Sequence, residues 1–253
     1  MERLWLLLVV TVLAGCVSTQ HPVALSNRNE VVVMGMIHSQ HKTSEFYSLE
    51  VVEAWVRAIK PDYIMVEIPP DRIDKAIQQY EQDGVVTEPR SVLYPEFTDV
   101  VLPLRSELKF ELIPVSAWTL DMAKERSAKL EEWKHTRPGD TQEIETAKSR
   151  MFARMRDEIG GDPRKMHTDE FDEIVREGME PYIRLFNEDL GQGGFANITD
   201  AHYALIAEAL DQHRGEGKRF LVMFGNWHKW FFLEQLRKRD GIILRNPIEF
   251  LED

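Results

Sequence analysis

Five short apolar runs along the chain have the character of buried β-strands. Most are continuous rather than alternating, which is typical of strands that are covered on both faces. Polar, helix-type segments separate them, so we predict an α/β fold with a mostly parallel sheet flanked by helices. The predicted strands are roughly residues 30–37, 63–68, 110–116, 219–224 and 241–245.

Helical periodicity fills the connections between the first three strands. In residues 44–59 the apolar side chains recur at helical spacing, with Ser44 available as an N-cap and Pro61 just beyond the end. Further helices are predicted over residues 71–82 and 95–109. The first strand, its helix and the second strand form a βαβ unit, whose right-handed crossover brings both strand ends to one edge of the sheet.

A long charged stretch at about residues 120–190 carries helix-type sequence and no strand pattern. Breaks at 138–140 and 160–163, which both contain Pro and Gly, divide it into three predicted helices. We interpret the stretch as a helical insertion. It is either a lid or partner surface over the edge of the sheet, or a purely structural layer.

The end of the chain repeats the order of the beginning. After the glycine-rich turn 191–194, Thr199 is expected to cap a helix that leads into the strand at 219–224. A further helix is predicted over 230–239. Strand, Gly-x-x-His, helix and strand occur in both parts, so we interpret the sheet as two related half-units.

Residues 1–15 have the organisation of a secretory signal peptide, with an apolar stretch that is too short to span a bilayer. Residues 13–16, Leu-Ala-Gly-Cys, resemble the bacterial lipobox, which implies cleavage before Cys16 and lipidation of Cys16, palmitate included. The alternative is an uncleaved anchor. Val17 follows in place of the Asp that retains many lipoproteins at the inner membrane, so we expect a lipid anchor in the bacterial cell envelope, at the periplasmic side of the outer membrane.

Composition suits one globular domain behind a short tether. Residues 16–29 lack periodicity and are interpreted as the tether, and residues 30–253 as a single α/β domain with the insertion. Hydrophobic residues make up 43% of the chain, and its one cysteine excludes an internal disulfide. The net charge of −12 leaves no basic footprint, so nucleic acid is not expected as a partner.

Two strand-ending segments share the pattern Gly-x-x-His. Residues 35–38 (Gly-Met-Ile-His) follow the first strand, and residues 225–228 (Gly-Asn-Trp-His) follow the fourth. Glu67 interrupts the second strand near its end, where an acid is costly to bury. Ligands bind at the carboxyl edge of open α/β sheets, so we predict that His38, Glu67 and His228 meet there in a metal or acid/base site.

The competing interpretation is structural, with His38 and His228 as satisfied core or capping histidines and Glu67 paired with an arginine. Polar neighbours of the two histidines are secondary candidates for binding substrate or stabilising an oxyanion. These are Ser39, His41, Asn226 and Lys229. His202 is expected on a helix over the sheet, and the remaining histidines among surface charges are expected to be exposed: His135, His167 and His213.

Three motifs of the chain resemble those of the TraB/GumN/Tiki family. They are Val-Met-Gly-Met-Ile-His-Ser at 33–39, Pro-Asp-Tyr-Ile-Met-Val-Glu-Ile-Pro at 61–69 and Val-Met-Phe-Gly-Asn-Trp-His-Lys at 222–229. That family belongs to a superfamily that includes the erythromycin esterases and the haem-binding lipoprotein ChaN. The resemblance implies an α/β fold of two related halves with His38, Glu67 and His228 clustered between them. The third motif departs from the family, because many relatives have small residues and a Gly-His-Leu pattern there.

The resemblance implies a hydrolase of peptidase or esterase type that acts on a small molecule or a peptide. In one scheme His38 and His228 hold a divalent ion such as Mn, Co or Zn, and Glu67 completes its shell or polarises water. In the other scheme no metal takes part, and Glu67 orients a histidine that activates water. The alternatives are an inactive envelope interaction protein or a haem-binding lipoprotein, with an axial ligand from Tyr47, Tyr94 or His41.

Overall fold

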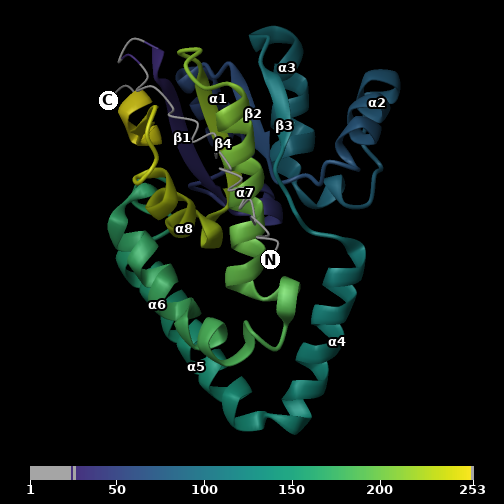
Figure 1. Cartoon of the computed structure of the whole chain (residues 1–253), viewed down its shortest axis with the longest axis vertical. Coiled ribbons are helices and arrows are strands. Elements are labelled where there is room, and N and C mark those ends of the chain that lie inside the picture. The colour runs from purple at the N-terminus through teal and green to yellow at the C-terminus, as the bar shows by residue number, and fades with distance from the viewer. Residues whose placement is uncertain (1–23, 25–26, 252–253) are drawn as a thin grey trace, which may run out of the picture.

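The computed structural model describes residue 24 and residues 27–251, so the predicted signal peptide and the lipidation of Cys16 lie outside the described residues. Its centre is a five-stranded parallel sheet in the order β3-β2-β4-β1-β5 (Figure 1). The predicted α/β fold is confirmed, and all five predicted strands are present. They are β1 Asn29–Met36, β2 Tyr63–Val66, β3 Glu111–Pro114, β4 Arg219–Gly225 and β5 Ile242–Arg245.

The strand order brings the three sequence motifs to one edge of the sheet. β1 and β4 are direct neighbours, with Met36 opposite Gly225, so the two Gly-x-x-His segments leave the sheet side by side. β2 lies on the other side of β4, with Val66 opposite Met223. Glu67 follows Val66 and therefore lies at the end of β4. All strands run in the same direction, so their carboxyl ends form a single rim.

Helices cover both faces of the sheet, as expected for continuous apolar strands. Val32 of β1 belongs to the same buried cluster as Val56 of α1, whereas its neighbour Val33 belongs to a cluster with Ile206 of α7 and Phe232 of α8. No helix in the described part of the chain has the length and apolar character needed to cross a bilayer. The helices that flank the sheet are α1 Leu49–Ile59, α2 Ile73–Asp83, α3 Leu102–Leu108, α7 Phe195–Gln212 and α8 Asn226–Leu236.

The first predicted helix is wrong in its first turn, because α1 begins at Leu49 and not at Ser44. The preceding backbone is committed to a loop. The backbone N–H of Tyr47 donates to Ser44 Oγ (2.9 Å), and the carbonyl of Tyr47 lies 2.8 Å from Nδ1 of the buried His41. The polar groups of this loop are therefore satisfied without helical hydrogen bonds.

The last two long helices begin earlier than predicted. Asn187 Oδ1 accepts from the backbone N–H groups of Ala196 and Asn197, so α7 begins at Phe195 and Thr199 lies inside it rather than at its cap. α8 begins at Asn226 directly after β4. His228 therefore lies in the first turn of a helix, where the backbone fixes its direction.

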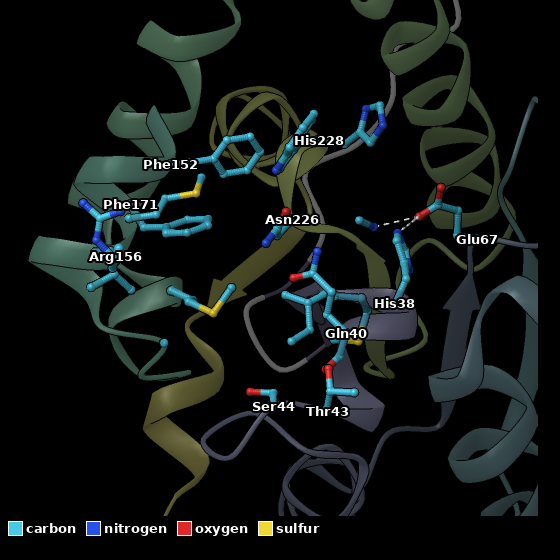
Figure 2. Close-up of a pocket in the computed structure, with 18 residues that line it drawn as sticks. His38, Gln40, Thr43, Ser44, Glu67, Phe152, Arg156, Phe171, Asn226 and His228 are labelled. Atoms are coloured by element: carbon cyan, nitrogen blue, oxygen red, sulfur yellow. Dashed lines mark hydrogen bonds and ion pairs between the residues drawn. The ribbon is translucent and has the colours of Figure 1, made fainter. Parts of the chain in front are cut away.

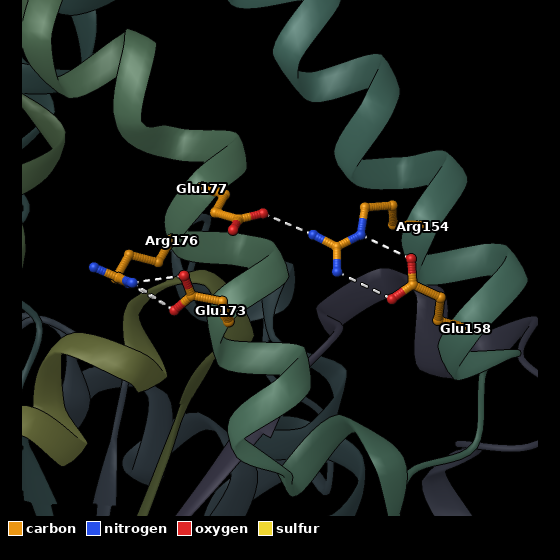
Figure 3. A network of polar contacts seen from close by, with 5 residues as sticks. All are labelled: Arg154, Glu158, Glu173, Arg176 and Glu177. Atoms are coloured by element: carbon orange, nitrogen blue, oxygen red, sulfur yellow. Dashed lines mark hydrogen bonds and ion pairs between the residues drawn. The ribbon is translucent and has the colours of Figure 1, made fainter.

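The insertion contains the three predicted helices and extends beyond the carboxyl rim (Figure 1). α5 and α6 pack closely, because a Cβ at Gly178 would lie 2.6 Å from Met151 Cβ. Arg154 of α5 pairs with Glu177 of α6 at the surface, and Glu158, one turn after Arg154, binds the same guanidinium (Figure 3). Exposed pairs of this kind contribute only about 0 to 1 kcal/mol each, so apolar packing holds the insertion together. The helices are α4 Leu120–Thr136, α5 Pro138–Arg154 and α6 Asp169–Phe186, with a π-helical turn at Met155–Ile159.

Candidate functional site

A cavity of about 830 Å³ opens at the carboxyl rim, between the ends of β1 and β4 and the helical insertion. His38, Glu67 and His228 line one side of it (Figure 2). Phe152 and Phe171 of the insertion lie on the other side (Figure 2). Six further apolar side chains line the cavity, namely Met36, Ile37, Met155, Ile159, Met166 and Trp227, and the other polar lining residues are Gln40, Thr43, Ser44, Arg156 and Asn226.

His38 is held between two glutamates in an unusual backbone conformation. Its φ of 52° lies in the left-handed region, which is uncommon for a non-glycine residue and is often found at functional sites. Nδ1 lies 2.7 Å from Glu96 Oε1, and Nε2 lies 3.6 Å from Glu67 Oε2. Burial alone would lower the pKa of His38, but Glu67 and Glu96 raise it to about 9. His38 is therefore an imidazolium at neutral pH, with its Nε2–H outside close hydrogen-bond distance of Glu67.

Glu67 is buried and is held by neighbours on both oxygens. Oε2 accepts from the backbone N–H of Gly225 (2.7 Å), and Oε1 accepts from the hydroxyl of Tyr94 at 3.4 Å. Burial raises the pKa of Glu67, while His38 and the Gly225 N–H act in the opposite direction. Burial and then Glu67 raise the pKa of Tyr94, so its hydroxyl stays protonated as a donor.

Glu96 was not among the predicted site residues and Tyr94 was predicted only as a possible haem ligand, although both contact the predicted site residues. The available signal was an acid within an apolar run, since Phe97, Val100 and Val101 follow Glu96 and all of them are buried. Glu67 was identified by this same criterion. In the predicted helix over 95–109 the pattern is weaker, because Thr98 and Asp99 interrupt the apolar positions after Glu96.

His228 is a neutral histidine with a fixed tautomer. The Thr199 hydroxyl donates to the Phe195 carbonyl (2.5 Å), and the same oxygen lies 2.7 Å from His228 Nδ1. Because the hydroxyl hydrogen is already used, Nδ1 donates to Thr199 and the lone pair lies on Nε2. Burial lowers the pKa of His228 well below its ordinary value, and His202 lowers it further. The ring stacks on Phe195 with centroids 4.8 Å apart, which holds its plane in place.

Comparison of the chain with protein-family models, curated proteins and solved structures gave no match. The resemblance to the TraB/GumN/Tiki family therefore stays a prediction from three short motifs.

The four secondary candidates lie in different surroundings. Asn226 lines the cavity, and Ser39 is exposed outside its lining. His41 is buried, with Nε2 accepting from the Ile37 N–H (3.1 Å) and Nδ1 bonded to the loop before α1. Lys229 is buried and lies 2.5 Å from an oxygen of Asp172. His41 and Lys229 are thus bonded within the protein, and Asn226 is the candidate that faces the cavity.

His167 differs from the exposed histidine that the sequence suggested, and that expectation is wrong. It is buried, accepts from the backbone N–H of Gly35 at Nε2 (3.1 Å) and lies 2.7 Å from the Pro163 carbonyl at Nδ1. Burial lowers its pKa to about 3. His167 therefore stays neutral and ties the start of the first Gly-x-x-His segment to the insertion.

The site residues do not form a metal-ligand set. In the part of the chain that the structure describes, no group of three or more His, Cys, Asp or Glu side chains is placed to hold an ion. His38 faces two glutamates, and Nδ1 of His228 is turned to Thr199. The divalent ion therefore stays a prediction from the resemblance.

The predicted haem ligands are engaged in contacts within the protein. The hydroxyl of Tyr47 donates to the Gly35 carbonyl (3.2 Å), and that of Tyr94 faces Glu67. His41 has both ring nitrogens bonded to backbone groups. Haem therefore stays a prediction from the resemblance.

Proposed function

We propose that this protein is a hydrolase that cleaves an ester or amide bond by acid–base catalysis, with two histidines in opposite protonation states. One observation carries the proposal. On one side of the cavity, His228 offers a neutral ring with an unpartnered Nε2 among the described residues, and His38 is held as an imidazolium by Glu67 and Glu96. Environments that push two pKa values apart identify acid and base.

The proposed reaction uses water as the nucleophile. His228 Nε2 takes a proton from water while the water oxygen bonds to the carbonyl carbon and the C=O electron pair moves onto oxygen. The Nε2–H of His38 donates to that oxyanion. When the tetrahedral intermediate collapses, the bond to the leaving group breaks and His228 returns its proton to the leaving oxygen or nitrogen.

Glu67 is proposed as a positioning residue. It holds His38 in the charged form from 3.6 Å, and its hydrogen bond to Gly225 N–H fixes the carboxylate against the end of β4. The apolar side of the cavity, formed by residues such as Phe152 and Phe171, favours an acyl or aromatic group next to the scissile carbonyl.

The test is hydrolysis of p-nitrophenyl esters of increasing acyl length by the purified full-length chain, with and without a chelator. We expect turnover that rises with acyl length, survives chelation and is lost in His228→Gln. Activity that disappears with chelator and returns with Zn²⁺ would favour the metal-dependent scheme. Failure to hydrolyse any ester or peptide, together with a Soret band on addition of haem, would favour the haem-binding alternative.

From the lipobox resemblance alone, we further propose that the chain is a lipid-anchored envelope protein modified at Cys16. The test is incorporation of labelled palmitate during expression in bacteria, compared between the natural chain and Cys16→Ser. We expect label and membrane association in the natural chain and neither in the variant. Equal labelling of both chains would contradict the assignment.

A further inference from the structure

Two arginines near the site, Arg90 and Arg126, form no ion pair with an acid among the described residues, although the charge of Arg90 acts on Glu67. Arg126 of α4 lies over the rings of Trp118 (5.4 Å) and Tyr182 (5.7 Å), and its Nε donates to the Tyr182 hydroxyl (3.1 Å). Arg90 lies 5.3 Å from the ring centroid of Tyr94. Aromatic contacts thus position both guanidinium groups, and their terminal N–H groups have no partner within the described chain.

Most arginines in the described part of this acidic chain form ion pairs, and these two do not. The chain has a net charge of −12, and arginines such as Arg57 and Arg137 form pairs with two carboxylates each. Lys148 of α5 adds a third cation, since its Nζ lies 5.0 Å from the Tyr182 ring centroid. Burial and then Arg126 lower the pKa of Lys148, which shows that the two cations lie close together. Arg126 and Lys148 thus lie over one aromatic ring, and the acids whose charge acts on Lys148 and Arg90 are Glu145 and Glu67, neither of which forms an ion pair with them.

The unpaired arginines lie within electrostatic reach of the catalytic histidines. Trp118 under Arg126 lies 6.4 Å from the His202 ring, and that ring lies 5.4 Å from His228. Arg126 contributes to lowering the pKa of His228, and Arg90 to lowering that of His202. An anion bound by the arginines would therefore lie on the side of His202 and within electrostatic reach of the proposed base.

Buried donors without partners point to a ligand at the same place. Three of the six such side-chain atoms in the described residues are donors here, namely Arg90 Nε, Ser116 Oγ and His202 Nε2. Ala117 N–H donates to His202 Nδ1 (2.8 Å), so the proton of the neutral ring lies on Nε2. Ser116 N–H bonds to the carbonyl of Ile68, the residue after Glu67. Each buried donor without an acceptor reduces stability by about 1 to 3 kcal/mol, and a hydrogen bond to a ligand or a water would restore this free energy.

We propose that the substrate carries an anionic group, carboxylate or phosphate, on its leaving-group side, and that Arg126 and Arg90 bind it beside His228. Neither arginine lines the large apolar cavity. The acyl part would therefore occupy the cavity, the carbonyl would lie between His228 and His38, and the anion would lie on the α4 side. Arginine recognises both carboxylate and phosphate through paired N–H groups. The orientation rests on the proposed hydrolase function, whereas binding of the anion does not.

The test compares matched octanoyl esters of 4-hydroxybenzoate, of its neutral methyl ester and of 4-hydroxyphenyl phosphate. The natural chain is expected to prefer an anionic ester by about tenfold or more in kcat/KM, as one charge-assisted contact implies. Which anionic ester is preferred distinguishes carboxylate from phosphate. Arg126→Gln should remove most of the preference, Arg126→Lys should retain part of it, and Arg150→Gln on the exposed face of α5 should not change it. Equal rates on neutral and anionic esters, or a preference unchanged in Arg126→Gln, would overturn the inference.

Direct binding separates this inference from the proposed function. Calorimetry with 4-hydroxybenzoate and with inorganic phosphate measures the anion site without any reaction. If no ester is hydrolysed but an anion binds and the binding is weakened in Arg126→Gln, the hydrolase proposal fails and the anion site stands. If neither anion binds, the inference is overturned whatever the activity.

Discussion

The two Gly-x-x-His segments end neighbouring strands and yet place their histidines in opposite environments. His38 leaves β1 in a left-handed turn and meets Glu67 and Glu96. His228 leaves β4 in the first turn of α8 and is surrounded by aromatic rings and the Thr199 hydroxyl. The pKa of His38 is raised to about 9, and that of His228 is lowered well below its ordinary value.

The difference shows that the shared motif determines where each histidine lies, while the neighbouring residues determine its protonation state. Parallel pairing of β1 with β4 brings both histidines to one rim. Two carboxylates then stabilise the charged form of His38, while burial without a carboxylate partner keeps His228 neutral. At neutral pH this unequal pair supplies a charged donor and a neutral base in the same molecule, whereas two equal histidines would do so only in the fraction that carries a single proton.

Replacing the neutral histidine, His228, should have the largest effect on activity. His228→Gln deletes the proposed base, and we expect kcat for ester hydrolysis to fall by about 10² to 10⁴, the usual range for general acid–base catalysis. The control is His135→Gln, because His135 is exposed on α4. Steady-state kinetics measure both, and a fall of less than about threefold in His228→Gln would remove His228 from the mechanism.

Removing a carboxylate that stabilises charged His38 should shift the alkaline limb of the pH–rate profile. The reaction needs protonated His38, so kcat/KM of the natural chain should fall as pH rises through about 9. Glu96→Gln removes the carboxylate 2.7 Å from Nδ1 and should move this limb to lower pH with reduced activity at neutral pH. Asp99→Asn, an exposed acid in the same turn, is the control. A limb that stays in place in Glu96→Gln would contradict the assignment.

The ion pairs of His38 with Glu67 and Glu96 should make the free energy of unfolding depend on pH. The folded-state pKa of His38 lies above the value of 6.5 for an unperturbed histidine, so its contribution is full below pH 6.5 and is lost as pH rises through about 9. Allowing for screening at a partly exposed ring, we expect roughly 1 to 3 kcal/mol over this interval. Denaturant unfolding at several pH values measures it, with His38→Gln as the comparison. Parallel pH profiles of the two chains would count against the His38 ion pairs.

We expect the smallest effect from removing the Thr199 hydroxyl, which holds His228 in its Nδ1–H tautomer. Thr199→Val removes the acceptor 2.7 Å from Nδ1 while keeping the side-chain shape, and we expect roughly a tenfold loss in kcat, or about 1.4 kcal/mol. Thr199→Ser keeps the hydroxyl and should retain most of the activity. If Val and Ser variants behave alike, the hydroxyl does not orient His228.

Much of the rim was predictable because it follows from local pattern and parallel pairing. Continuous apolar runs identified all five strands, and the right-handed βαβ unit placed Glu67 near His38. Helix starts were less accurate, because tertiary hydrogen bonds decided them. The side-chain oxygen of Asn187 caps α7 from outside the helix. The ring of His41 bonds to the Tyr47 carbonyl and so keeps the residues before α1 in a loop.

The protonation states and the supporting residues could not be predicted from the motifs. Glu96 reaches His38 across a large sequence separation, and Thr199 reaches His228 from another helix. Both contacts depend on packing of elements whose relative positions no local pattern contains. His167 illustrates the same limit, since a histidine among charged residues along the chain is buried once the turn before α6 packs against β1.

The central claim is that His38 is charged and His228 is neutral in the same cavity. Nitrogen NMR of the imidazole rings across pH 5 to 10 tests it directly, with His38→Gln and His228→Gln to assign the signals. We predict that His38 is doubly protonated at pH 7 and titrates near pH 9, and that His228 remains an Nδ1–H tautomer throughout. Two histidines that both titrate near pH 6.5 would contradict the account.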